Sequence, residues 1–86
     1  MKLKLKVLNN TDDVTKKQEL GLDFSYNECD VGDVTFYSIN AISKTYEGGK
    51  CWTEIFSNGR VFISPLQTED IEKLIDDQMK FSQFTI

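Results

Sequence analysis

Histidine is absent from this chain of 86 residues, which also has only one proline and two cysteines. Without histidine, the chain lacks the usual general base near neutral pH and the commonest metal ligand. Cys29 and Cys51 are too distant in sequence for a CxxC redox pair and too few for a zinc knuckle, so we expect two reduced thiols, with a disulfide as the alternative. No glycine-rich phosphate-binding motif is present. The sequence therefore predicts no catalytic residues, no cofactor and no metal site, and we expect the protein not to be an enzyme.

Long apolar runs are also missing. No segment approaches the roughly 18 apolar residues that a membrane-spanning helix needs. The alternating segment 1–6 has no continuous apolar stretch behind it and does not resemble a secretory signal. Fourteen acidic and ten basic residues give a net charge of −4, which disfavours non-specific attraction to nucleic acid or anionic lipid. We expect a cytoplasmic protein with no membrane partner.

Alternation of apolar and polar residues predicts the first strands. Residues 2–8 alternate lysine with leucine or valine, and residues 19–27 alternate apolar with small or polar side chains, as half-buried strands do. Between them, residues 9–17 suit a turn followed by a single helical turn. Residues 34–46 are rich in β-branched and aromatic side chains, but the run is long for one strand, so we expect a bend or bulge near Asn40.

Two pairs of turn residues predict hairpins. Gly48-Gly49 and Asn58-Gly59 suit two-residue loops with positive φ angles, which would join the run 34–46 to strands over 51–57 and 60–64. Such short loops determine the register. One face of the sheet would carry Ile42, Ile55 and Phe62, and the other Ala41, Phe56 and Val61 together with Trp52 and Ile63. Because both faces are apolar at their centres, we do not expect a sheet that is open to water on one side.

A helix is predicted over residues 68–80. Pro65 ends the preceding strand, Thr68 is a candidate N-cap, and apolar residues recur at helical spacing: Ile71, Leu74, Ile75 and Met79. One short helix covers only one face of a sheet. The sequence therefore predicts a single small α+β domain, in which a curled, barrel-like antiparallel meander of five strands is closed by one C-terminal helix.

The segment from Ile39 onward, with its Asn58-Gly59 hairpin and its helix with an acidic first turn, resembles a pattern found in small bacterial and phage proteins. It is similar to the small flagellar FlbD-type proteins. The resemblance covers the C-terminal half of the chain only. It implies the hairpin-plus-helix layout and a small accessory protein, and it carries over no functional residue.

Two surfaces are candidates for binding. The leading hypothesis is a non-catalytic protein-interaction domain, of the kind that phages and mobile elements encode to bind and modulate a host protein; a homodimer is an open alternative. Its expected interface combines aromatic anchors with the acidic helix, whose charges otherwise form an ordinary solvated face: Trp52, Phe56, Glu69, Asp70, Asp76 and Asp77.

The alternative hypothesis is a small nucleic-acid-binding β-barrel. Lys2, Lys4 and Lys6 would project from one strand face about 6.6–6.8 Å apart, close to the spacing of successive phosphates, with an aromatic platform beside them. Lysines on an edge strand also prevent edge-to-edge aggregation, and the net charge of −4 favours that simpler explanation.

Overall fold

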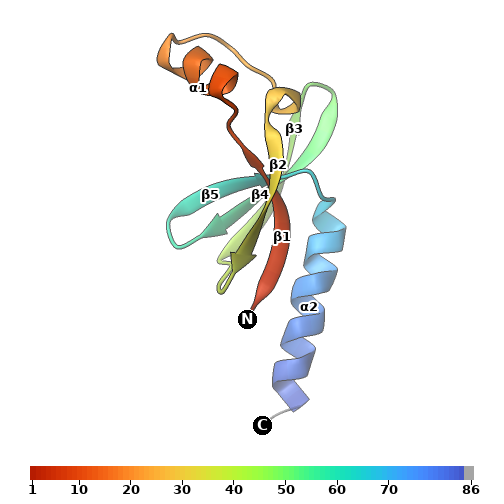
Figure 1. Ribbon diagram of the computed structural model, residues 1–86. Coiled ribbons are helices and arrows are strands. Elements are labelled where there is room, and N and C mark those ends of the chain that lie inside the picture. Colours follow the sequence, from red (N-terminus) through yellow and green to blue (C-terminus); the bar gives the residue numbers. More distant parts are fainter. Residues whose placement is uncertain (85–86) are drawn as a thin grey trace.

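The computed structural model describes the backbone of residues 1–84 and the side chains of residues 1–78. The chain forms two small sheets and two α-helices (Figure 1). Its elements follow one another as β1 (Leu3–Asn9), α1 (Asp12–Glu19), the 3-10 helix η1 (Tyr26–Glu28), β2 (Asp30–Phe36), β3 (Ala41–Glu47), β4 (Lys50–Ser57), β5 (Arg60–Ser64) and α2 (Thr68–Phe84). The radius of gyration is 14.7 Å, whereas a compact chain of this length would have about 12 Å. The molecule is therefore elongated, with α1 at one end and α2 extending towards the other.

The expected single sheet of five strands is wrong. β1 pairs only with β2 in one antiparallel sheet, and β3, β4 and β5 form a separate antiparallel meander. The predicted strand over residues 34–46 is in fact two strands in different sheets, because the chain changes direction after Phe36. Asn40 donates its N–H to the carbonyl of Phe56 at 2.8 Å, although Ala41 is the ladder partner of Phe56. Asn40 and Ala41 therefore both lie opposite Phe56, which makes a β-bulge at the expected position.

Polar side chains hold this change of direction in place. Ser57 Oγ donates to the carbonyl of Ser38 at 2.7 Å, and the Asn58 N–H donates to Asn40 Oδ1 at 2.9 Å. These contacts satisfy backbone groups that a continuous strand would have paired in a ladder. They link the segment 37–40 to the β4–β5 turn. As a result, β2 and β3 do not form one continuous strand and belong to different sheets.

The predicted strand over residues 19–27 is also wrong. α1 is a helix of eight residues rather than one turn; Thr11 Oγ1 accepts the Val14 N–H at 3.2 Å at its start. A second local motif then forms η1, in which the Ser25 N–H donates to Glu28 Oε2 at 2.7 Å in a capping box. Side-chain caps thus override the alternating pattern in this segment. We call residues 10–29 the arm, because α1 and the connection that follows it project away from the sheets (Figure 1).

Both predicted hairpins are confirmed. Ile55 on β4 pairs with Ile42 on β3 and with Phe62 on β5. All four loop residues have positive φ angles, as type I′ turns require: Gly48, Gly49, Asn58 and Gly59. The face that carries Ile55 is the buried one.

One core joins the two sheets to α2. It contains apolar residues from β1, β2, β4 and α2: Leu3, Leu5, Val7, Phe36, Ile55 and Ile71. Phe36 and Phe62 meet edge to face across the sheets with ring centroids 5.0 Å apart. Ser64 Oγ donates to the carbonyl of Lys6 at 2.6 Å, which ties β5 to β1. Leu3, Leu5 and Val7 thus point inward and the intervening lysines outward, as their alternation predicts.

The C-terminal helix is confirmed and continues to Phe84, beyond the expected end at residue 80. Ile71 is fully buried and Ile75 packs against the core, while the side chain of Met79 lies outside the described part of the helix. Thr68 directs its hydroxyl to Thr53 Oγ1 at 2.8 Å, and Thr53 in turn donates to the carbonyl of Leu66. This buried hydroxyl pair anchors the first turn of α2 to β4.

Candidate protein-binding groove

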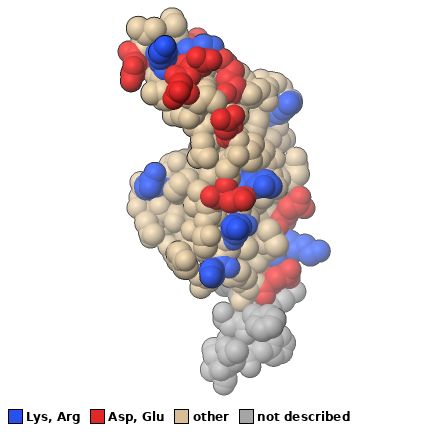
Figure 2. Space-filling model, in the orientation of Figure 1, with Lys and Arg blue, Asp and Glu red and all other residues tan. Residues whose placement is uncertain are grey.

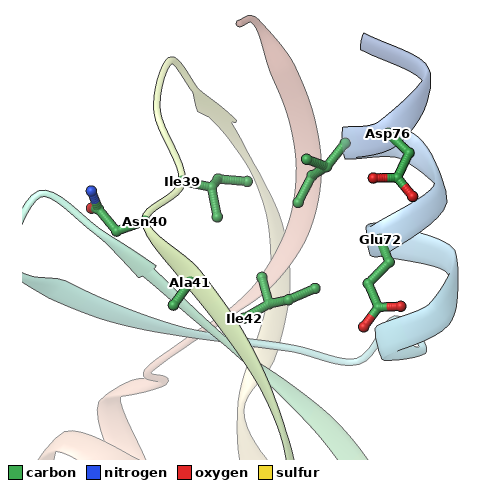
Figure 3. A pocket seen from close by; sticks show the side chains of 7 residues that line it. Ile39, Asn40, Ala41, Ile42, Glu72 and Asp76 are labelled. Carbon is green, nitrogen blue, oxygen red and sulfur yellow. The ribbon is translucent and has the colours of Figure 1, made fainter. Parts of the chain in front are cut away.

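A groove of about 340 Å³ lies between the beginning of β3 and the second and third turns of α2. Figure 3 shows the strand side and the helix side facing each other across it. Four consecutive residues line it from the strand side and three from the helix: Ile39, Asn40, Ala41, Ile42, Glu72, Ile75 and Asp76. We call it the β3–α2 groove.

The bottom of the β3–α2 groove is apolar and held by the core. Ile39, Ile42 and Ile75 are each half-buried, and all three pack against the central cluster. The side chains of Ile39 and Ile42 point into the space between β3 and α2 (Figure 3). Because the core fixes one side of each isoleucine, the exposed side is a preformed apolar surface.

The helix side of the groove is acidic. Glu72 and Asp76 are exposed, and no basic side chain among the described residues forms an ion pair with either of them. Glu69, one turn earlier, differs. Its Oε1 accepts a hydrogen bond from Lys44 Nζ at 2.6 Å, which holds the pKa of the Glu69 carboxyl below its usual range and raises the pKa of Lys44. Glu69 thus binds within the chain, whereas the two groove carboxylates face solvent.

Of the six residues that the sequence predicts for a protein interface, the groove contains only Asp76. Trp52 is buried: its ring lies against Tyr26 with centroids 5.4 Å apart, and Nε1 donates to the carbonyl of Glu47 at 3.0 Å. Phe56 is half-buried on the same face of the meander as Trp52, which is the face opposite Ile55. Asp70 and Asp77 are exposed outside the groove.

Sequence reasoning missed Ile39 and Glu72 as groove residues, and it assigned Ile42 and Ile75 to the core alone. The acidic side of the groove could have been predicted from helical spacing, because Glu72 and Asp76 lie four residues apart and Ile75 lies between them. Nothing in the local sequence placed Ile39 opposite α2.

The face of the meander opposite Ile55 is partly open to water. Val61 is 55% exposed and Ala41 is exposed, while Phe56 and Ile63 are half-buried. Trp52 continues the same face and is covered by Tyr26 of η1. The expectation that the sheet is not open to water on one side is therefore wrong: within the described chain Tyr26 covers the Trp52 end of this apolar face, but Val61 at the other end is exposed.

The three lysines lie on the outer side of β1, where Figure 2 shows a short row of basic side chains with acidic ones close by. Lys6 Nζ is 3.3 Å from Asp33 Oδ1 on β2. Trp52 belongs to the other sheet and is covered, so it does not form an aromatic platform beside Lys2 and Lys4. Nucleic-acid binding by this row stays a prediction.

Cys29 and Cys51 are both free and half-buried, and burial raises the pKa of the Cys29 thiol, with a smaller contribution from neighbouring carboxylates. No three histidine, cysteine, aspartate or glutamate side chains gather at a possible metal site within the part of the chain that the structure describes. Over the same part, no helix is long and apolar enough to cross a membrane.

Comparisons with known proteins identify no relative. No family model matches the chain, and neither the curated proteins nor the solved structures contain a match. The resemblance of the C-terminal half to FlbD-type proteins therefore stays an expectation.

Proposed function

We propose that the protein is a small non-catalytic interaction domain that binds a segment of another protein in the β3–α2 groove. The observation that supports this proposal is the combination of a fixed apolar bottom with two carboxylates that are not paired inside the described chain. Apolar surface that the fold leaves exposed beside uncompensated charge is typical of binding sites. If the only role of the three isoleucines were to complete the core, they would be expected to be fully buried, whereas each is half-buried.

The size of the groove indicates how much of a partner it accepts. Its volume of about 340 Å³ lies at the lower end of the range of about 300–1,000 Å³ seen for well-formed binding pockets. It therefore accommodates a few side chains rather than a domain surface. An interaction that used this groove alone would be transient, because small interfaces leave little free energy after the entropy cost of association.

Site-specific photocrosslinking tests the proposal. A photoreactive phenylalanine analogue replaces Glu72, which is exposed on α2 and points into the groove (Figure 3), and in a matched control it replaces Val31, which is exposed on β2 in the other sheet. In bacterial cells that express each variant, we expect a discrete heavier adduct from position 72 and not from position 31.

The absence of an adduct at position 72, or the same adducts from both positions, would contradict the proposal. An adduct of twice the mass of the chain would replace the external partner with a second copy. Both variants change exposed side chains, so circular dichroism is expected to show an unaltered fold.

A further inference from the structure

The open side of the β3–α2 groove is a free sheet edge. β3 is the outermost strand of its meander, and no other strand pairs with it among the described residues. The Gly48-Gly49 loop makes Glu47 and Lys50 the hydrogen-bonded pair that flanks the turn. Backbone groups alternate in direction along a strand, so Ile42 and Lys44 direct their N–H and C=O groups away from β4. These groups are available to an added strand.

The carboxylates of α2 have a spacing that an extended chain matches. Glu72 and Asp76 lie four residues apart on the helix, which corresponds to about 6 Å of rise along its axis. Side chains at positions i and i+2 of a strand project on one face about 6.6–6.8 Å apart. An extended segment that ran between β3 and α2, parallel to the axis of α2, would therefore bring two alternate side chains to the two carboxylates.

The chemistry of the groove selects lysine or arginine at those two positions. The aliphatic part of such a side chain would lie on Ile39, Ile42 and Ile75, while its charged end would reach the acidic side of the groove. The intervening side chain would point to the opposite face of the sheet, beside Ala41. A phosphate backbone or an acidic peptide would instead be repelled by Glu72 and Asp76.

We propose that the groove binds an extended protein segment with basic residues at alternate positions, Lys/Arg-x-Lys/Arg, which adds as a strand to the free edge of β3. This inference rests on the proposed function and specifies its partner. The contact is short: beyond Ile42, Lys44 already holds Glu69 across the groove end, so the acidic surface available to a partner ends there.

Three synthetic pentapeptides test the inference in titrations of the full chain followed by NMR. They are Thr-Lys-Val-Lys-Thr, its rearranged form Thr-Lys-Lys-Val-Thr, and the acidic Thr-Glu-Val-Glu-Thr, each with blocked ends. We expect the first to shift the amide signals of Ile42 and Lys44, and to bind about tenfold more tightly than either of the others, because only it satisfies both charge and spacing.

Two double variants separate the groove carboxylates from the general charge of the helix. Glu72→Gln/Asp76→Asn removes two charges from the groove, and the control Asp70→Asn/Asp77→Asn removes two exposed charges from the same helix outside it. Affinity for the alternating lysine peptide is expected to fall about tenfold in the first variant and to change less than about twofold in the control. The folds are expected to be unaltered, because all four side chains are exposed.

Equal binding of the three peptides, equal losses in the two double variants, or no shift at Ile42 and Lys44 would overturn the inference. If position 72 still crosslinks to a partner, the proposed function stands and only the basic strand fails. If crosslinking fails as well, both proposals fall together.

Discussion

Side chains that are almost inaccessible to water are concentrated in the two sheets and the start of α2, whereas the arm of residues 10–29 contributes only Val14 to this set. Leu20 and Leu22 of the arm are 72% and 56% exposed, while Ile55 and Ile71 of the body are at 0%. The hydrophobic effect scales with the apolar area removed from water. The body is therefore held by burial, and the arm must be held by something else.

Polar contacts position the arm. Glu47, at the β3–β4 turn, accepts hydrogen bonds from Ser25 Oγ at 3.4 Å and from the Tyr26 N–H at 3.2 Å. Lys50 Nζ donates to Asn27 Oδ1 at 3.3 Å, and the Tyr26 ring covers Trp52. A few hydrogen bonds at partly buried and exposed positions orient a segment but add little to global stability. We infer that the arm opens locally before the body unfolds, and that the β3–α2 groove, as part of the body, keeps its shape.

The largest expected effect is that of Ile55→Ala in the body. Ile55 is fully buried at the centre of the meander, so its truncation is expected to lower the free energy of unfolding by about 2–5 kcal/mol. Val61→Ala, on the neighbouring strand but 55% exposed, is the control and is expected to change it by less than about 1 kcal/mol. Urea denaturation measures both. Similar losses in the two variants would remove the distinction between the buried and open faces.

A smaller, local effect is expected for Glu47→Ala. The substitution removes the acceptor of two hydrogen bonds from the arm, which with a charged acceptor correspond to about 1.5 kcal/mol, or roughly tenfold faster amide exchange in α1 and η1. The body should keep its exchange rates. If the whole chain were destabilised as strongly as by Ile55→Ala, the arm would be part of the same cooperative unit.

Acid should loosen the arm by a further small amount. Lys17 and the Ser25 N–H hydrogen-bond the Glu28 carboxyl and hold its pKa below the usual value. A carboxyl whose pKa is depressed on folding stabilises the fold above its unfolded pKa of about 4.3, and this contribution is lost as the pH falls through the folded pKa. The protection of arm amides, expressed relative to their intrinsic exchange rate at each pH, is therefore expected to fall below about pH 4. In Glu28→Gln this pH dependence should be reduced; an unchanged profile would assign it to another group.

Sequence reasoning succeeded where local chemistry decides the structure. Gly48-Gly49 and Asn58-Gly59 require positive φ angles, and these turns determined both hairpin registers. The helical recurrence of Ile71 and Ile75 located α2. Caps explain the failure in the arm: the alternation from Leu20 to Tyr26 was real, but the Ser25–Glu28 capping box offered the backbone closer partners than a distant strand.

The groove could not be predicted because it depends on contacts between segments distant in sequence. Ile39 lies in the connection that a continuous strand would have removed, and its place opposite α2 follows from the separation of the two sheets. The acidic character of the helix was evident from sequence. Which of its carboxylates form no ion pair within the described part of the chain was not evident, because this depends on the placement of Lys44 on β3, which pairs with Glu69.

Native-state hydrogen exchange of the full chain tests the division between body and arm most directly. We predict two levels of protection: the amides of β1, β4 and the first turns of α2 exchange only through global unfolding, and those of α1 and η1 exchange through a lower-energy local opening. A single level of protection across residues 3–78 would contradict this account.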